Sequence, residues 1–217
     1  ALAVSAAVRW GLPDPGRKQN GSSLGGAEGL WESVRAVRWP LLTLVGLALC
    51  RTIVNRNILG FLPTLYVERG LGLWGGGAAN GVMLLFGSLG VMAGGVLSDR
   101  FGRRRVIIVG IGWALFFLIA FLVAPPALGI FIIAVYGIGI YMPVGVIVAL
   151  AQELLPGHRG FASTLPLGMT GFLASFSVLP LSATAERVGL LQAFWVLPIF
   201  LLVSFLLALL LPEEGRR

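Results

Sequence analysis

The sequence predicts an all-α membrane protein with six transmembrane helices. Hydrophobic residues make up 57% of the 217 residues and charged residues only 12%, whereas soluble domains contain about 25% charged residues. The chain contains six apolar runs close to the roughly 20 residues that a helix needs to cross the hydrocarbon core. Basic residues concentrate in alternate connections between these runs. Apolar excess, run length and charge distribution therefore indicate the same fold class.

The six predicted spans follow one another with short connections. The last run contains no Lys, Arg, Asp or Glu. At about 1.5 Å per helical residue it reaches ~33 Å, which is enough to span with slight tilt. The predicted spans are residues 40–67, 74–98, 106–124, 127–151, 161–184 and 190–211.

The residues outside these spans are predicted to be connecting structure. Residues 1–8 are apolar but too short to cross a bilayer, and we interpret them as the remnant of a preceding transmembrane helix. Residues 9–39 are rich in Gly, Ser and Pro, which favours a cytoplasmic linker. Within it, the aromatic and basic residues at 31–39 are typical of an interfacial helix. Residues 212–217 are predicted to form a cytoplasmic tail.

Basic residues predict the orientation of the helices, because cytoplasmic connections contain an excess of Lys and Arg. Twelve basic residues fall on the side of the linker: Arg9, Arg17, Lys18, Arg35, Arg38, Arg100, Arg103, Arg104, Arg105, Arg159, Arg216 and Arg217. Only Arg69 and Arg187 fall on the opposite side. We therefore expect a multi-pass protein of the cell (inner) membrane, with the linker and the carboxyl terminus in the cytoplasm. The net charge of +7 is then explained by basic residues that set the orientation and contact anionic lipid head groups. We therefore expect no nucleic-acid partner.

The first span contains two arginines and two asparagines within residues 51–57, and two of these four are candidates for a substrate pathway. Arg51 lies about 18 Å along the helix from Trp39, near the midplane, where an arginine usually faces a partner or a wet cavity. Asn55 shares its face because it lies four residues away. We predict that both line the path of an anionic solute. The alternative is that Arg51 bonds the backbone of a neighbouring helix and that Arg56 extends toward the membrane surface.

The fourth span provides a third pathway candidate, Tyr136. It shares a helix face with Gly139 and Pro143, and Pro143 is expected to kink the helix. Aromatic packing is the alternative role for Tyr136. No acidic residue lies in the middle of any predicted span, so proton coupling would require a carboxylate outside these six helices.

The second span is rich in glycine, with a Gly-x-x-x-Gly spacing at Gly77 and Gly81 and again at Gly90 and Gly94. Small residues let helices approach closely in lipid. We expect these glycines to pack the six helices into a bundle.

The connection after the second span combines glycines with opposite charges, and residues 95–105 read GVLSDRFGRRR. Gly95 would permit close helix approach, and Gly102 would permit a left-handed turn. The charged groups suit a cluster of hydrogen bonds that joins helix ends: Asp99, Arg100, Arg103 and Arg104. We expect Glu153, at the end of the fourth span, to pair with Arg103 or Arg104.

The spacing of this turn resembles the signature loop of the major facilitator superfamily, found between its second and third helices and again between its eighth and ninth. The resemblance implies the carboxyl-terminal half of such a transporter, helices seven to twelve, built as two inverted three-helix repeats. It also implies that the turn and Glu153 form a conformational gating motif. The implied partners are an amino-terminal six-helix half, the lipid bilayer and a small-molecule substrate.

A second segment is similar to one particular group within this superfamily. Residues 151–160 read AQELLPGHRG and are similar to the loop after helix ten of fosmidomycin-resistance-type efflux transporters. That similarity implies proton-coupled export, by antiport, of a small anionic drug or related metabolite, and hence antibiotic resistance. The next helix differs, because four other residues stand where those proteins have more glycine: Ala174, Ser175, Ser177 and Pro180.

A fainter repeat of the turn occurs three helices later. Residues 186–189 read ERVG, which echoes DRFG at residues 99–102. The two lie at corresponding places in two three-helix units, as inverted repeats require.

Other functions have less support in the sequence. No Ser/His/Asp set, metal-ligand cluster or phosphate-binding loop is present in the sequence, so we expect no enzymatic activity, no metal and no cofactor. Two alternatives to efflux remain. One is uptake of a small organic anion or sugar by the same superfamily, and the other is a receptor or structural membrane subunit that moves no solute.

Overall fold

The computed structural model describes residues 33–35, 37–70 and 72–211. Val37–Arg217 forms one compact unit, and its described residues form helices and short connections. The predicted helix remnant at residues 1–8, most of the predicted linker and the tail at residues 212–217 lie outside the described residues. Arg38 and Trp39, which the sequence placed in the linker, are the first residues of the first spanning helix.

The described residues contain six helices long and apolar enough to cross a membrane, so the predicted fold class is confirmed. Their bounds agree with the prediction to within a few residues. The spans are Arg38–Glu68, Trp74–Phe101, Arg103–Val123, Leu128–Leu154, Pro156–Val188 and Leu190–Leu209. Large apolar side chains cover their outer faces, including Phe131 and Leu179, which are 73% and 71% exposed. Such a surface suits lipid and not water.

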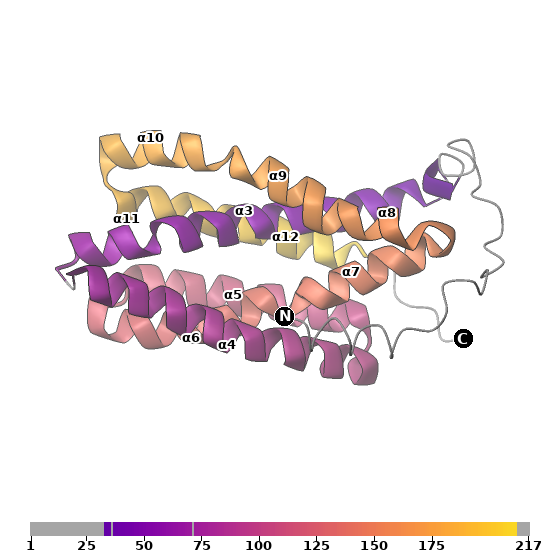
Figure 1. Ribbon diagram of the computed structural model, residues 1–217, viewed down its shortest axis with the longest axis horizontal. Coiled ribbons are helices and arrows are strands. Elements are labelled where there is room, and N and C mark those ends of the chain that lie inside the picture. The colour runs from indigo at the N-terminus through magenta and orange to yellow at the C-terminus, as the bar shows by residue number, and fades with distance from the viewer. Residues whose placement is uncertain (1–32, 36, 71, 212–217) are drawn as a thin grey trace, which may run out of the picture. The chain divides into compact units, whose positions relative to one another are not determined.

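Three spans are single helices and three are interrupted. The first three are α3 (Arg38–Glu68), α4 (Gly72–Phe101) and α5 (Arg103–Val123). The fourth consists of α6 (Pro126–Tyr141) and α7 (Pro143–Leu154). The fifth consists of η1 (Pro156–His158), α8 (Arg159–Thr164), the π-helix η2 (Leu165–Met169), α9 (Thr170–Ser175) and α10 (Val178–Val188). The sixth consists of α11 (Leu190–Ala193), η3 (Phe194–Val196) and α12 (Leu197–Leu209). Figure 1 shows these helices running side by side.

The break between α6 and α7 was predicted at Pro143, which is the first residue of α7. Proline has no backbone N–H and its ring clashes with the preceding turn, so the helix is interrupted there. Next to this break, the carbonyl oxygen of Ile140 in the last turn of α6 accepts a hydrogen bond from Arg51 of α3.

Close packing between α4 and the fourth span depends on glycine. A Cβ atom at Gly90 would collide with the carbonyl oxygen of Ile138, and one at Gly94 with that of Met142. Gly77 and Gly81, in contrast, are exposed and have no neighbour within 4 Å of a built Cβ atom. The close-packing prediction therefore holds for the second glycine pair and is wrong for the first.

Gly95 does not have the predicted role, because a Cβ atom there would also meet nothing within 4 Å. Its neighbour Gly94 makes the close approach. On a helix, adjacent residues point about 100° apart, so one position decides which glycine faces the neighbouring helix.

Polar side chains also join α3 to its neighbours. Pro63 leaves the carbonyl oxygen of Leu59 without its usual helical donor, and Nδ2 of Asn80 on α4 donates a 2.9 Å hydrogen bond to it. On the other side, Oγ of Ser204 on α12 donates a 2.9 Å hydrogen bond to the carbonyl oxygen of Leu47. Such bonds supplement packing where no hydrophobic effect draws helices together.

The two turns that echo each other in sequence share a backbone conformation. Gly102 has φ 86° and ψ 148°, and Gly189 has φ 94° and ψ 149°. In each turn the glycine N–H donates to the carbonyl oxygen four residues earlier, that of Ser98 or of Ala185. The positive φ predicted at Gly102 is confirmed, although its ψ is extended. The match supports two related three-helix units.

Candidate functional site

Arg51 is the centre of the candidate site. It is only 7% exposed, and its Nη1 donates a 2.8 Å hydrogen bond to the carbonyl oxygen of Ile140 in the last turn of α6. Its Nη2 lies 3.4 Å from Oγ1 of Thr52. Nε has no hydrogen-bond partner among the described residues. The backbone bond is the contact that the alternative for Arg51 predicted, and it leaves other donor groups of the guanidinium available.

Asn55 and two tyrosines complete a polar cluster with Arg51, in which Arg51 and Tyr136 are buried and Asn55 and Tyr141 are half-buried. Nδ2 of Asn55 donates a 3.3 Å hydrogen bond to the hydroxyl oxygen of Tyr141, and both Tyr136 and Tyr141 lie within electrostatic range of the guanidinium. In the described part of the chain, Oδ1 of Asn55 and the hydroxyl of Tyr136 are buried without a hydrogen-bond partner. The structure thus brings together the three predicted pathway residues and leaves a donor free on Arg51, an acceptor free on Asn55 and a hydroxyl free on Tyr136 among the described residues.

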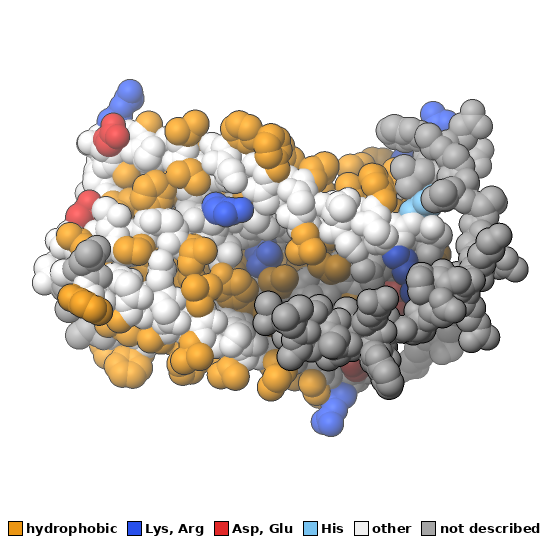
Figure 2. Space-filling view, viewed as in Figure 1, with side chains coloured by type: hydrophobic (Ala, Val, Ile, Leu, Met, Phe, Trp, Pro, Cys, Tyr) orange, Lys and Arg blue, Asp and Glu red, His pale blue; other side chains and the backbone are white. Residues whose placement is uncertain are grey.

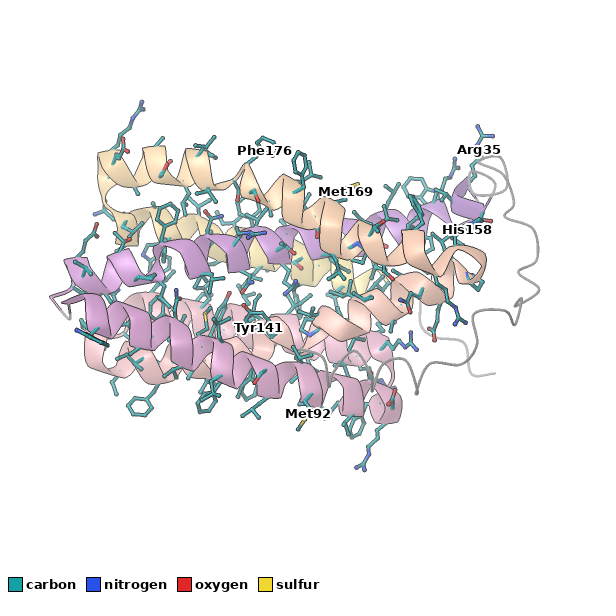
Figure 3. All side chains as sticks on the ribbon, in the orientation of Figure 1. Arg35, Met92, Tyr141, His158, Met169 and Phe176 are labelled. Carbon is teal, nitrogen blue, oxygen red and sulfur yellow. The ribbon has the colours of Figure 1, made fainter. Side chains whose placement is uncertain are left out.

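Tyr141 belongs to this cluster but was not predicted. It is labelled in Figure 3, and its ring lies against α4, where a Cβ atom at Gly87 would be 2.5 Å from Cδ2 of Tyr141. The available signal was a tyrosine in an apolar span two residues before Pro143. Which helix it meets depends on the break at Pro143, whose angle the sequence does not define.

The charge of Arg51 is uncompensated within the described residues. The ion pair found there joins Arg103 to Glu153, at a helix end, and no carboxylate of the described residues pairs with Arg51. On the side of the molecule drawn in Figure 2, acidic side chains lie toward the two ends, whereas basic side chains also lie in the middle. A buried cation beside unpartnered donors is chemically suited to bind an anion.

The second arginine and the second asparagine of residues 51–57 lie apart from this cluster. Arg56 is exposed, and its Nη2 would lie 3.8 Å from a Cβ atom built at Gly171. Asn57 is 1% exposed, and its Nδ2 donates 2.8 Å hydrogen bonds to the carbonyl oxygen of Ile53 and to Oγ of Ser177.

The arginines of the glycine-rich turn connect three helix ends. Nη2 of Arg103 lies 2.5 Å from Oε1 of Glu153, which joins the start of α5 to the last turn of α7 as the sequence predicted. Nη2 of Arg104 donates a 2.7 Å hydrogen bond to the carbonyl oxygen of Leu209, the last residue of α12. A cation at a helix carboxyl end satisfies free carbonyl groups and is stabilised by the helix dipole.

Asp99 and Arg100 do not take part in these connections. Both are exposed, and Asp99 forms no ion pair with any residue that the structure describes. The charged cluster predicted for this turn is therefore formed by Arg103, Arg104 and Glu153 without Asp99. A role of the turn in gating stays a prediction.

Among residues 33–35, 37–70 and 72–211, no three His, Cys, Asp or Glu side chains lie close enough together to hold a metal ion.

Comparison with known proteins finds one matching family and two relatives. The family model of the Major Facilitator Superfamily matches residues 1–178 and 93–217. The chain is 35% identical over 135 residues to the uncharacterized MFS-type transporter YfnC of Bacillus subtilis (strain 168), a match that covers 62% of this chain and 33% of that protein. It is 31% identical over 128 residues to an uncharacterized transporter of Buchnera aphidicola subsp. Schizaphis graminum (strain Sg), covering 56% of this chain and 31% of the relative.

The matched part of the chain thus spans about a third of the length of each of these relatives. The family match, the six helices long enough to span a membrane and the glycine-arginine turn after the second of them agree. The chain belongs to the Major Facilitator Superfamily.

Proposed function

We propose that this chain forms the carboxyl-terminal half of a transporter that exports a small anionic solute across the cell membrane in exchange for protons. The observation that supports an anionic solute most directly is Arg51, a buried guanidinium with no carboxylate partner among the described residues. Burying a charge is costly unless it is paired. A bound anion would compensate the guanidinium, and Asn55, Tyr136 and Tyr141 would orient it.

An amino-terminal six-helix half is the proposed partner, and Arg56 supports it. Its guanidinium is exposed on α3 within a membrane-spanning segment, where contact with lipid would be unfavourable. A second bundle against this face would enclose a polar path between the halves. The described acidic residues Glu68, Asp99, Glu153 and Glu186 lie at or beyond helix ends. The carboxylate that takes up protons is therefore proposed to lie in the other half.

Export and the substrate class rest on the resemblance of residues 151–160 to fosmidomycin-resistance-type efflux proteins, and antibiotic resistance is the proposed biological effect. The glycine-arginine turn is proposed to stabilise one conformation at the cytoplasmic side, through the contacts of Arg103 with Glu153 and of Arg104 with Leu209. Breaking these contacts would let α5, α7 and α12 separate when the transporter changes conformation.

The experiment uses liposomes that contain this chain together with an amino-terminal six-helix half, a pH gradient and radiolabelled fosmidomycin. We expect gradient-driven flux that falls roughly 30-fold or more in Arg51→Met, because removing one partner of a buried charge pair costs about 2–5 kcal/mol and each 1.4 kcal/mol is tenfold. Arg51→Lys keeps the charge and should retain part of the flux. Arg187→Gln serves as the control, since it removes an exposed arginine in the last turn of α10, outside the proposed anion site. Full flux in Arg51→Met would exclude the proposed anion site.

The proposed orientation has its own test, which uses a protein with Cys50 replaced by alanine. Arg105→Cys and Glu186→Cys place thiols at exposed positions on opposite ends of the spans. An impermeant thiol reagent added to intact cells should label Glu186→Cys, and should label Arg105→Cys only after the membrane is permeabilised. The reverse pattern would place the linker outside the cell.

A further inference from the structure

Arg56 places an exposed positive charge near the middle of the membrane-spanning helices. It lies on α3, three residues after the midpoint of the span Arg38–Glu68. Side chains of a helix tilt toward its amino end, so the side chain of Arg56 is directed back toward that midpoint. Its Nη2 would lie 3.8 Å from a Cβ atom built at Gly171, which is one residue before the midpoint of the span Pro156–Val188. The guanidinium is therefore close to mid-membrane depth.

The charge of Arg56 is not compensated within the described part of the chain. There it forms no ion pair and no hydrogen bond. Arg51 on the same helix differs, because it is buried and bonded to the carbonyl oxygen of Ile140. A guanidinium in hydrocarbon is costly and usually has a partner, and phosphate head groups lie outside the hydrocarbon and not at this depth. The occupant of this surface must therefore supply a polar or negative group at mid-membrane depth.

A second copy of this chain does not meet that requirement. Its described acidic residues lie at or beyond helix ends, so none of them reaches the depth of Gly171. A symmetric contact at Arg56 would also bring two like charges together, which is unfavourable. In contrast, the matched relatives continue far beyond the part that this chain matches, which is 33% and 31% of their lengths. A different helical bundle is thus the better occupant.

The surface beside Arg56 leaves space for a helix. Gly60 is exposed one turn further along α3, and Gly168 is exposed three residues before Gly171. A Cβ atom built at Gly60 or Gly168 would meet nothing within 4 Å. Small residues let a neighbouring helix approach closely in lipid, so a side chain on that helix could reach the guanidinium.

We propose that Arg56 forms an ion pair with a carboxylate in the middle of a helix of the amino-terminal half, and that this helix docks on the surface formed by Arg56, Gly60, Gly168 and Gly171. The inference rests on the proposed function for the existence of that half. The charge pairing is supported by the depth and exposure of Arg56. A carboxylate can accept two parallel hydrogen bonds from a guanidinium, so the pair would fix where the two halves meet and leave Arg51 to the solute.

The test measures binding of two transmembrane peptides to the purified full chain in phosphatidylcholine nanodiscs. Each peptide is a helix of about 20 leucine and alanine residues, with either a glutamate or a glutamine at its centre. A dansyl group on the peptide accepts energy from the six tryptophans of the chain. Buried glutamates can have pKa values of about 8–9, so at about pH 9 the central glutamate is at least half ionised. We expect the glutamate peptide to bind roughly 5- to 30-fold more tightly than the glutamine peptide, which corresponds to about 1–2 kcal/mol.

Three variants assign this preference to one residue. In Arg56→Gln the preference should disappear. Arg187→Gln is the matched control and should keep it, because Arg187 is exposed but lies in the last turn of α10. Arg56→Glu guards against misfolding, since it should reverse the preference and bind a peptide with a central lysine more tightly than the glutamate peptide.

Three results would overturn the proposal. Equal binding of the glutamate and glutamine peptides by the parent chain would show that no carboxylate is needed at Arg56. A preference that is lost in Arg51→Met but kept in Arg56→Gln would assign the carboxylate to Arg51. Peptide binding that weakens when a nanodisc holds two chains instead of one would show that a second copy covers this surface. No solute moves in these assays, so a missing flux with the peptide preference intact would contradict the proposed transport alone.

Discussion

Arg103 and Glu153 connect two helices at the same end of the bundle, with Nη2 of the arginine 2.5 Å from Oε1 of the glutamate. Arg103 is the first residue of α5, and Glu153 lies in the last turn of α7. The side chains are 23% and 54% exposed, so solvent screens their attraction. The pair therefore fixes which helix ends meet more than it stabilises the fold.

We expect Arg103→Met and Glu153→Gln to be coupled by roughly 0.2–1 kcal/mol, the range for exposed ion pairs. The measurement is a double-mutant cycle on the unfolding free energy of the purified chain in detergent at low salt. Combining Glu153→Gln with Arg105→Gln instead should give additive effects, because Arg105 is exposed and forms no ion pair with the described residues. Additive effects for Arg103 and Glu153 as well would contradict the pairing.

Asn80→Leu should destabilise the chain by about 0.6 kcal/mol and by no more than roughly 1.7 kcal/mol, the measured range for hydrogen bonds between membrane helices. The cost arises because the carbonyl oxygen of Leu59 loses its donor. In a Pro63→Ala background the restored backbone N–H at position 63 can bond that oxygen, so the same substitution should cost less. Unfolding in detergent measures both values. An equal cost in the two backgrounds would show that the loss has another origin.

Gly94→Ala should destabilise the chain, because the added methyl group collides with the carbonyl oxygen of Met142. Overpacking of this kind costs about 1–3 kcal/mol. Gly81→Ala on the same helix meets open space and should be neutral, or stabilising by up to roughly 1 kcal/mol through helix propensity. Thermal unfolding of the two variants in parallel tests the difference, and a neutral Gly94→Ala would contradict the close approach of α4 and the fourth span.

Gly102→Ala and Gly189→Ala should each destabilise the chain by about 1–3 kcal/mol, because both positions have positive φ with extended ψ, a conformation reserved for glycine. Gly95→Ala is the control within the same motif, since Gly95 is helical and unobstructed. Unfolding midpoints measured in the same detergent compare the three. If Gly95→Ala were the most harmful, the assignment of the turn to Gly102 would be wrong.

The spans and the pair of Arg103 with Glu153 could be predicted from the sequence because both depend on simple counting. A span depends on the length of an apolar run, and alternation of the spans places Arg103 and Glu153 at the same end. The choice between Gly94 and Gly95 could not be predicted. A bond from Arg51 to the backbone of a neighbouring helix was one of two alternatives, but the sequence could not identify the carbonyl group of Ile140 as the acceptor. Both details depend on the rotation of each helix about its axis, which many side chains determine together and no local pattern specifies.

The π-helix η2 has a consequence for how insertions and deletions should be distributed in this chain. The N–H of Thr170 bonds the carbonyl oxygen of Leu165, five residues earlier, so this turn holds one residue more than an α-helical turn. Deleting one residue between positions 165 and 169 would let the same turn close as an α-helical turn, with the following helix close to its present orientation. Deleting one residue within α9 would instead rotate everything after it by about 100° and turn Ser177 away from Asn57. The π-helical turn can therefore absorb the loss of one residue as a loop does, whereas the α-helical part of this span cannot.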